Sequence, residues 1–280
     1  MVIVDLSLAQ ASPAAHPPSS YWNLMRIKSF LLSVSAFAVF GMGTAHANLI
    51  LNGGFEQTSN GTNKQLTAGS STTQTNFTTL TGWNSQSLTD GGGGYNFVMN
   101  PSQPAPNAVL SLYTTGNGFK ASADGGNFFA SDPAYGPGLL YQTVNGLVVG
   151  DLYTLTFSYA LGQQSGYTGS NSDYWKFGLG TTLSDLNRQT SVLTIPQGGF
   201  SGWQTVSTTF NATSSTEMLG FLAATSTPGA PPFMLLDGVS LNAVAKAPAA
   251  AVPEPATWSL LLGGLGLVGV MARRRYNKRA

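Results

Sequence analysis

The sequence predicts an all-β fold, a two-sheet antiparallel β-sandwich of the jelly-roll type. Short runs rich in Thr, Val, Tyr and Phe alternate between apolar and polar residues, and Gly, Asn, Asp and Pro bound them. No long stretch of the body places apolar residues at helical spacing. Other runs are apolar on both faces, which is typical of strands inside a packed sandwich. About ten to twelve strands of this kind fit two sheets packed face to face.

The clearest predicted strand spans residues 152–159, where Tyr, Leu, Phe and Tyr alternate with Thr and Ser. Residues 204–210 repeat this pattern, whereas residues 218–223 and 233–241 are apolar on both faces. Asn145-Gly146 favours a tight turn after a further strand at 139–144. These runs place strands along most of the body of the chain.

The N-terminal region carries an export pattern that begins only at Met25. A basic stretch at 25–28, an apolar run at 30–42 and the motif Ala45-His46-Ala47 are the three parts of a secretory signal peptide. Residues 25–47 are therefore predicted to be the signal peptide, with Ala45 and Ala47 forming its cleavage site and Asn48 as the first mature residue. Residues 1–24 have no strand or helical period, and we interpret them as an upstream extension outside the true protein.

The C-terminal region has three parts at residues 253–280. Pro253, Glu254 and Pro255 come first, and an uncharged run of 17 residues at 256–272 follows. A helix of that length reaches about 25 Å, near the lower limit for the core of a bilayer, so a single transmembrane helix is predicted. The basic cluster after it is formed by Arg273, Arg274, Arg275, Lys278 and Arg279. Such a cluster stays on the cytoplasmic side of a membrane. The alternative is a hydrophobic core helix at the end of the chain.

This tail resembles the PEP-CTERM sorting signal of Gram-negative bacteria that make exopolysaccharide. The resemblance implies recognition near residues 253–255 by an exosortase, which is a membrane-embedded transpeptidase-like enzyme. The precursor would be held transiently at the inner membrane, the hydrophobic span would be removed, and the body would be released or attached at the cell surface. The Ala- and Pro-rich residues 243–252 form the linker that gives the enzyme access.

Composition excludes several classes of function for the body of the chain. Residues 48–252 carry five basic and nine acidic side chains, a net charge of −4, which does not suit a nucleic-acid partner. Cysteine is absent, and both histidines precede residue 48. Ser-His-Asp and Cys-His catalysis and zinc sites built on those ligands are therefore impossible there. A glycosidase needs only two carboxylates, and this remains the third hypothesis.

A second resemblance covers the body at 48–242. Residues 48–56, 140–144, 153–157, 203–212 and 235–241 occur in an order that is similar to galactose-binding-like jelly-roll domains, which include many carbohydrate-binding modules. The resemblance implies one β-sandwich, but a fold of this kind hosts adhesion and structural roles as well as sugar binding.

The same resemblance implies a structural Ca²⁺ held by Glu56, after the first strand, and Asp237, inside the last strand. A charge at position 237 is costly in an apolar strand unless it is paired or liganded, and no Lys or Arg falls beside it. Oxygen ligands of this kind suit a hard cation. The alternative is that Asp237 accepts hydrogen bonds from backbone amides and that Glu56 is solvated.

Aromatic and polar side chains around the loop at 165–173 are the predicted glycan site. Aromatic rings would stack on sugar faces, and amide or carboxylate groups would bind hydroxyls. The candidates are Tyr167, Asp173, Tyr174, Trp175, Gln163 and Gln164, with Tyr95 and Tyr135 next. The alternative for these rings is the core, to which we assign Trp83, Trp203, Tyr153 and Phe157.

These observations lead to three functional hypotheses. The first is an exported, non-enzymatic protein of the cell surface or extracellular matrix that associates with exopolysaccharide and aids aggregation or biofilm formation. The second is a purely structural surface protein without a glycan site. The third is a glycoside-active enzyme. Glycan retention that depends on calcium separates the first two hypotheses.

Overall fold

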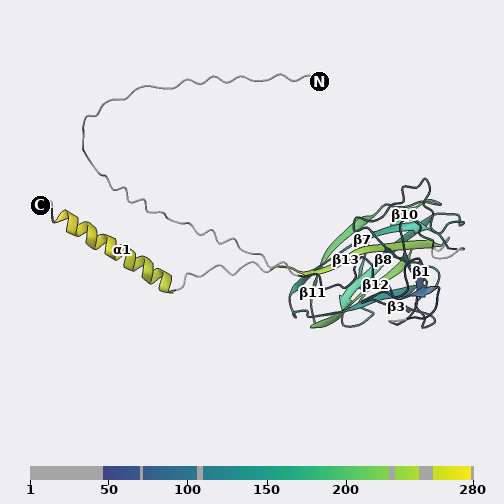
Figure 1. Ribbon diagram of the computed structural model, residues 1–280, viewed down its shortest axis with the longest axis horizontal. Coiled ribbons are helices and arrows are strands. Elements are labelled where there is room, and N and C mark those ends of the chain that lie inside the picture. The colour runs from purple at the N-terminus through teal and green to yellow at the C-terminus, as the bar shows by residue number, and fades with distance from the viewer. Residues whose placement is uncertain (1–46, 70–71, 106–109, 227–230, 246–254, 279–280) are drawn as a thin grey trace, which may run out of the picture. The chain divides into compact units, whose positions relative to one another are not determined.

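The computed structural model describes residues 47–69, 72–105, 110–226, 231–245 and 255–278. The predicted upstream extension, the predicted signal peptide before Ala47, and Pro253 and Glu254 lie outside the described residues. The described residues form thirteen strands and one helix. The strands build the sandwich, and the helix is described separately below (Figure 1).

Two sheets make the sandwich, which confirms the predicted fold class. The seven-stranded sheet has the order β11 (Gln204–Asn211), β7 (Leu152–Gln163), β13 (Pro232–Ala243), β5 (Phe128–Ser131), β4 (Asn96–Met99), β1 (Lys64–Leu66) and β2 (Phe77–Thr78). The six-stranded sheet contains β10 (Leu193–Ile195), β8 (Asn171–Gly180), β12 (Thr216–Thr225), β6 (Gly138–Asn145) and β3 (Asn84–Ser87), and β9 (Arg188–Gln189) also pairs with β8. The pair β1–β2 is parallel and the other strand pairs within the two sheets are antiparallel.

The main core lies between the sheets and follows the predicted alternation. In β7, Tyr153, Leu155, Phe157 and Tyr159 are all buried, while the Thr and Ser residues between them are partly exposed. Phe157 contacts Phe221 of the opposite sheet with ring centroids 5.1 Å apart. The predicted core positions of Trp83, Tyr153 and Phe157 are confirmed, since each is at most 3% exposed.

A second apolar cluster lies on the outer face of the seven-stranded sheet. Successive residues of a strand point to opposite faces. Phe129 therefore enters the main core, while Phe128 and Ala130 enter the second cluster. Trp203 packs against this second cluster and is only partly buried, so its predicted place in the main core is wrong. Its indole nitrogen donates a hydrogen bond of 2.9 Å to the carbonyl of Lys120.

A β-bulge in β13 changes which face its side chains occupy. The pairing with β7 shifts between Asp237 and Ser240, and Gly238 has a φ of 59°. Phe233 and Leu235 precede the shift and belong to the second cluster, whereas Val239 and Leu241 follow it and belong to the main core. Asp237 therefore does not share a face with Val239 and Leu241, although simple alternation along the strand would place them together, because the extra residue of a bulge reverses the alternation.

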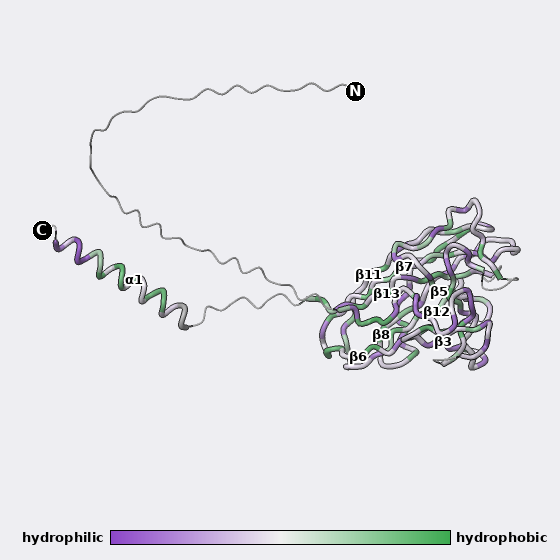
Figure 2. The backbone as a smooth tube through the Cα atoms, in the orientation of Figure 1, coloured by the Kyte–Doolittle hydropathy of each residue, from purple (hydrophilic) through white to green (hydrophobic). Residues whose placement is uncertain are grey.

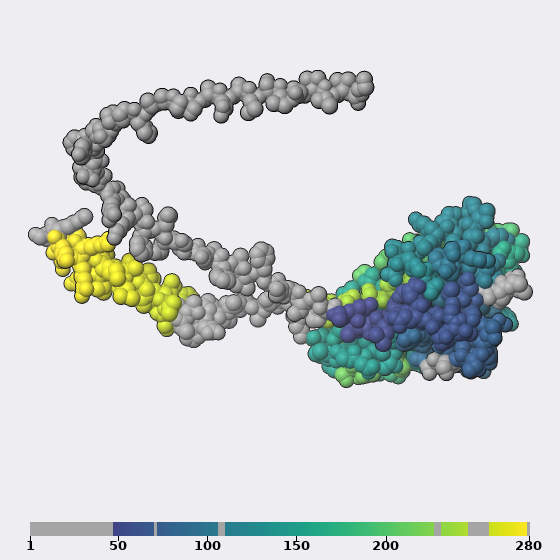
Figure 3. Space-filling model, in the orientation of Figure 1, coloured from purple at the N-terminus to yellow at the C-terminus, as the bar shows by residue number. Residues whose placement is uncertain are grey.

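The segment before Glu56 is not a strand, contrary to the sequence-based expectation. Residues 48–56 run along the surface of the sandwich as turns and extended chain (purple in Figure 3), although the amide of Leu49 donates to the carbonyl of Leu241 at 2.9 Å. Asn52 and Phe55 have φ values of 53° and 58°, which L-residues seldom adopt. These turns place Glu56 beside the loop that precedes β5.

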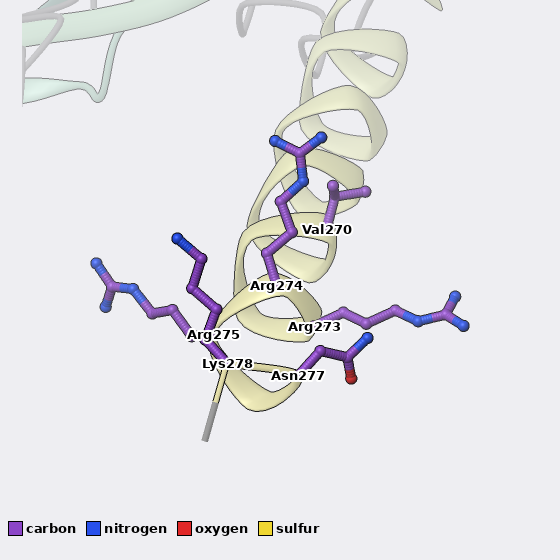
Figure 4. A pocket seen from close by; sticks show the side chains of 6 residues that line it. All are labelled: Val270, Arg273, Arg274, Arg275, Asn277 and Lys278. Carbon is purple, nitrogen blue, oxygen red and sulfur yellow. The ribbon is translucent and has the colours of Figure 1, made fainter. Parts of the chain in front are cut away.

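The helix α1 spans Pro255–Tyr276 and ends in the three arginines at 273–275. Among the described residues, no helix is both long and apolar enough to cross a membrane. The predicted transmembrane helix is therefore not found among these residues. Figure 2 shows the hydrophilic end of α1 next to its apolar part, and Figure 4 shows the basic side chains extending in different directions.

Candidate functional site

Three carboxylates gather where the chain leaves its first turns and where the bulge interrupts β13. An ideal Cβ placed on Gly54 would lie 2.5 Å from Oδ2 of Asp124 and 4.0 Å from Oδ1 of Asp237. Oε1 of Glu56 accepts a hydrogen bond of 2.5 Å from the amide of Asn127, on the same loop as Asp124. The two residues predicted to hold calcium are therefore brought together, and Asp124 joins them. Sequence spacing gave no sign of Asp124, because its loop has no regular period.

Asp237 is the buried member of this group, with a 1% exposed side chain. Burial raises its pKa to about 7, and the like charges of Asp124 and Glu56 act in the same direction. The hydroxyl of Ser122 and the amide of Gly238 donate hydrogen bonds to its two oxygens. Glu56 and Asp124 are exposed. The backbone bond to Asp237 and the exposure of Glu56 agree with the alternative to a metal site.

The chemistry of these side chains suits a hard cation, but their present arrangement is not that of a formed site. Among the described residues, no three or more His, Cys, Asp or Glu side chains are grouped so that they would hold a metal ion. A cation between Glu56 and Asp237 would displace the hydrogen bonds that these carboxylates now accept.

Most of the predicted glycan residues are inside the protein. Trp175 and Asp173 have no exposed surface, Gln163 has none and Gln164 has 5%. Trp175 packs 5.9 Å from Phe129 between the sheets and donates a hydrogen bond to the carbonyl of Leu235. It cannot stack on a sugar, and its predicted role there is wrong.

The buried polar residues of that prediction have structural partners or lie between the sheets. Gln163 accepts a hydrogen bond of 2.6 Å from the amide of Gly198 and donates one to the carbonyl of Gly169. Asp173 occupies the inward face of β8. Tyr167 is 45% exposed and Tyr174 is partly exposed, so these two aromatic residues remain accessible.

An aromatic groove lies elsewhere, between β1, β2 and the loops that flank β4 and β5. It encloses about 500 Å³, and its lining includes Gln65, Gln74, Phe77, Asp90, Tyr95 and Tyr135. Tyr135 is 69% exposed, and its ring meets the edge of Tyr95 with centroids 5.0 Å apart. Tyr95 is in turn supported by Phe97 at 4.7 Å and Phe233 at 6.0 Å. The groove thus presents one free ring on a fixed aromatic base, which we call the tyrosine groove.

Glycine forms the floor of the tyrosine groove. A Cβ on Gly93 would lie 2.2 Å from the carbonyl oxygen of Leu66, and one on Gly94 would lie 2.6 Å from Cα of Gly138. Only glycine allows the backbone to pass so closely. Asp90 accepts a hydrogen bond of 2.9 Å from the amide of Gly92, and bonds from Ser87 and Gly92 lower the pKa of Asp90. The glycine run at 91–94 therefore shapes this surface.

A second recess of about 750 Å³ lies beside the loop that was predicted as the glycan site. Tyr113 and Gln197 contribute to its lining, together with glycines at 198 and 199. The hydroxyl of Tyr113 accepts a hydrogen bond from the amide of Gly166 and donates one to the carbonyl of Tyr167. Gly198 packs against the Tyr113 ring, where an added Cβ would lie 3.5 Å away. This ring therefore has less free surface than that of Tyr135.

Both recesses lie toward one end of the sandwich. At this end Pro232, the first residue of β13, pairs with Gln163, the last residue of β7. The last residue of β13, Ala243, pairs with Tyr153 at the other end, and the chain leaves the sandwich there toward its C-terminal motif. The tyrosine groove and the exit of the chain are thus at opposite ends of the same fold.

Comparison with known proteins identifies the C-terminal region. Residues 251–275 match the PEP-CTERM protein-sorting motif. This motif indicates an exported protein that an exosortase processes at the membrane and that is displayed at the cell surface. No curated protein matches the chain.

Carbohydrate-binding modules are among the solved structures that resemble this one. TmCBM61, solved with β-1,4-galactotriose, shares 12% identity over 71% of this chain and 99% of its own, with a TM-score of 0.37. A CBM4 structure shares 14% over 70% and 99%, with a TM-score of 0.30. The K1 cleaved adhesin domain of Lys-gingipain from Porphyromonas gingivalis shares 14% over 68% and 99%, with a TM-score of 0.36. At these sequence identities and TM-scores, the similar structures identify no site in this chain.

Proposed function

We propose that this protein is an extracellular glycan-binding module, displayed on a Gram-negative cell, that associates with exopolysaccharide through the tyrosine groove. The observation that carries the proposal is the exposed Tyr135 ring held against Tyr95 beside the side chains of Gln65, Gln74 and Asp90. An aromatic face offers apolar contact to a sugar ring, and amides and a carboxylate accept or donate bonds to hydroxyls. Retention of exopolysaccharide at the surface would aid aggregation and biofilm formation.

The tyrosine groove has the features that a shallow sugar site needs. Its aromatic base is fixed by the second apolar cluster, so little ordering is required when a ligand binds. Its polar groups are on short strands and Gly-rich turns, where they remain accessible to solvent. Its place at the end of the sandwich away from the chain exit leaves it free to meet a polymer.

Co-sedimentation of the purified chain with exopolysaccharide from the producing organism tests this function. We expect saturable binding that Tyr135→Ala weakens roughly tenfold or more, which corresponds to about 1.4 kcal/mol. Tyr167→Ala is the matched control, because it removes an exposed tyrosine outside the lining of the groove. Loss of exopolysaccharide binding in Tyr167→Ala alone would mean that the glycan site lies in the loop at 165–173 and not in the tyrosine groove.

Absence of saturable binding in the unaltered chain would favour the second hypothesis, a purely structural surface protein. The glycoside-active enzyme is the weakest of the three. The buried carboxylates Asp132 and Asp173 are at most 1% exposed and cannot flank a glycosidic bond in their present positions. We therefore propose no catalytic role.

We also propose that calcium binds between Glu56 and Asp237, with Asp124 as a third carboxylate. The support is electrostatic, because the like charges of Glu56 and Asp124 act on the buried Asp237. A bound Ca²⁺ would neutralise the three carboxylates, whose oxygens are the ligands that the ion prefers. A melting temperature that rises with Ca²⁺ in the unaltered chain, and rises less in Asp237→Asn, is the expected result. Equal rises in both would contradict this site.

The partner for the C-terminal region is proposed to be the exosortase itself. The described side chains of α1 are exposed, and Leu260, Leu262 and Leu267 are 82%, 67% and 63% exposed. An apolar surface of this extent is typical of a segment that another molecule covers. Recognition of this helix together with the adjoining motif would bring residues 253–255 to the enzyme.

A further inference from the structure

Five polar side chains lie inside the sandwich near the end that carries the tyrosine groove. We call Asn96, Ser131, Asp132, Asn171 and Asp173 the inner polar cluster. Each of them is at most 1% exposed. Buried polar groups in folded proteins almost always have hydrogen-bond partners, so each exception requires an explanation.

Strand register brings the members of the inner polar cluster together. Phe129 of β5 and Trp175 of β8 meet across the two sheets with ring centroids 5.9 Å apart. Ser131 lies two residues after Phe129 in β5, and Asp173 lies two residues before Trp175 in β8. Because alternate residues of a strand share a face, both side chains point inward like those two rings. Asn96 is paired with Ser131.

The remaining two members adjoin this pair. Asp132 follows Ser131 directly and is close enough to Asp173 for its charge to act on that carboxylate. Asn171 shares the buried face of β8 with Asp173, since the residue between them is partly exposed.

Six side-chain oxygens of the cluster have no hydrogen-bond partner: Oδ1 of Asn96, Oγ of Ser131, Oδ2 of Asp132, Oδ1 of Asn171, and Oδ1 and Oδ2 of Asp173. The amide nitrogen of Asn96 donates to Oγ of Ser85 at 2.8 Å, which leaves only its oxygen unused. Oδ1 of Asp132 accepts bonds of 2.7 and 3.0 Å from the amides of Ala134 and Tyr135, which likewise leaves Oδ2.

The charge of the cluster is also uncompensated. Burial raises the pKa of Asp132 to about 6 and that of Asp173 to about 7. The Thr225 hydroxyl lies near enough to lower the pKa of Asp173, although no contact to its oxygens has full hydrogen-bond geometry. Within the described residues, no lysine or arginine contributes to either shift. Two neighbouring buried carboxylates without a cation are costly when ionised.

We propose that the inner polar cluster binds one hard divalent cation, with Ca²⁺ as the ion that fits its six unpartnered oxygens. Calcium takes six to eight oxygen ligands from carboxylates, amide carbonyls and similar groups, and tolerates irregular geometry. Asp132 and Asp173 would supply the charge, while Asn171, Ser131 and Asn96 would supply neutral oxygens. This site is separate from the one proposed at Glu56 and Asp237, because the two involve different residues and different loops.

The proposed ion would also support the tyrosine groove. The amide of Asp132 donates to the carbonyl of Tyr95, and its Oδ1 accepts from the amide of Tyr135. A cation on Oδ2 would fix the side chain that holds the Tyr135 loop, next to the backbone amide that bonds Tyr95. The number of bound calcium ions can be measured without any glycan. The calcium site can therefore fail its test while the glycan site passes, and the reverse.

Counting calcium in the refolded full chain tests the proposal. Because both carboxylates are buried, metal-free protein is prepared by unfolding with chelator and then refolding with or without Ca²⁺. Using Asp237→Asn as the background removes a ligand of the other proposed site. We expect one equivalent of bound Ca²⁺ in this background by elemental analysis after gel filtration, and its loss when Asp173→Asn is added. Asp185→Asn, which changes a carboxylate in a surface turn, is the matched control and should retain the ion.

Thermal unfolding of the same variants provides a second measurement. In chelator, Asp173→Asn should melt higher than its parent because it removes an unpaired buried charge, and Ca²⁺ should raise the melting temperature of the parent alone. Two results would overturn the proposal. One is an Asp237→Asn background that binds no calcium, which would leave a water-filled polar cluster. The other is equal calcium binding with and without Asp173→Asn and Asp132→Asn.

Discussion

At the scale of single residues, the approach of Gly53 to β13 is among the closest contacts of the fold. A Cβ on Gly53 would lie 1.9 Å from the carbonyl oxygen of Val239, and the amide of Val239 donates to the carbonyl of Gly53 at 3.0 Å. Because both partners are backbone, neither can move aside without breaking the bulge.

Gly53→Ala is therefore expected to lower the free energy of unfolding by about 2 kcal/mol or more. Denaturant unfolding of the purified chain measures the change. Gly162→Ala is the control, since its added methyl group would meet only side chains at 3.8 and 4.0 Å. Equal stabilities of the two variants would show that the turn at Gly53 can rearrange freely.

The buried aspartates predict how stability depends on pH in metal-free protein. The folded pKa values of Asp132, Asp173 and Asp237 are about 6, 7 and 7, against an ordinary value of 3.8. The folded state holds protons that the unfolded chain has lost, so these groups stabilise most below about pH 4. Their contribution is lost as pH rises toward 7.

Urea unfolding between pH 4.5 and 7.5 in metal-free buffer measures this effect, and we expect stability to fall by at least about 1 kcal/mol. Asp132→Asn combined with Asp173→Asn should flatten much of the slope, while saturating Ca²⁺ should oppose the decline by favouring the ionised forms. A stability that increases across this window in the unaltered chain would contradict the raised pKa values.

Residue types alone could not separate core from surface among the aromatic and acidic candidates. Trp175 lies beside a polar loop in sequence, yet the register of β8 points its ring between the sheets. Asp173 lies on the same inward face of β8. Tyr135 has no strand pattern around it and is the most exposed aromatic residue of the tyrosine groove. Accessibility here depends on strand pairing, which local sequence does not determine.

At the scale of elements, Arg188 joins the two sheets along one open side of the sandwich. It lies on β9, which pairs with β8, and its guanidinium donates to the hydroxyl of Thr208 and the carbonyl of Thr209 on β11. The same group lies 4.4 Å from the centre of the Phe210 ring. One side chain thereby connects an edge strand of each sheet.

Arg188→Ala is expected to cost about 1–2 kcal/mol of stability, through lost hydrogen bonds and a lost cation–π contact. Arg188→Lys should recover only part of this loss, because an ammonium group cannot make the forked contact. Chemical denaturation of both variants provides the values. If Arg188→Ala unfolds like the unaltered chain, the sheets are held at this edge by their core alone.

Long alternating strands were the elements that the sequence predicted best. The predicted alternating runs at 152–159 and 204–210 correspond to β7 and β11, and the run at 218–223, which is apolar on both faces, corresponds to β12. The short strands β1 to β5 have two to four residues and no such repeat. The bulge in β13 was also missed, since Gly238 interrupts a run that looks continuous in the sequence.

At the scale of the whole molecule, the fold is complete before the sorting motif begins. The last strand ends at Ala243, and the described residues of α1 are exposed. The described residues of the motif, 255–275, contribute no strand to either sheet. Removal of the described residues of the motif therefore costs the sandwich none of its strand pairing.

Processing at this motif gives the final prediction. Replacing Pro253, Glu254 and Pro255 with alanine should leave the sandwich folded but block conversion to the mature form in the producing organism. Mass spectrometry of the surface-exposed protein should find the unaltered chain ending near residues 253–255 and the variant still carrying α1. A second variant, in which the three arginines at 273–275 are replaced, separates recognition of the motif from recognition of the basic end of the helix. Equal maturation of the motif variant and the unaltered chain would mean that the enzyme reads the helix and its arginines rather than the residues before them.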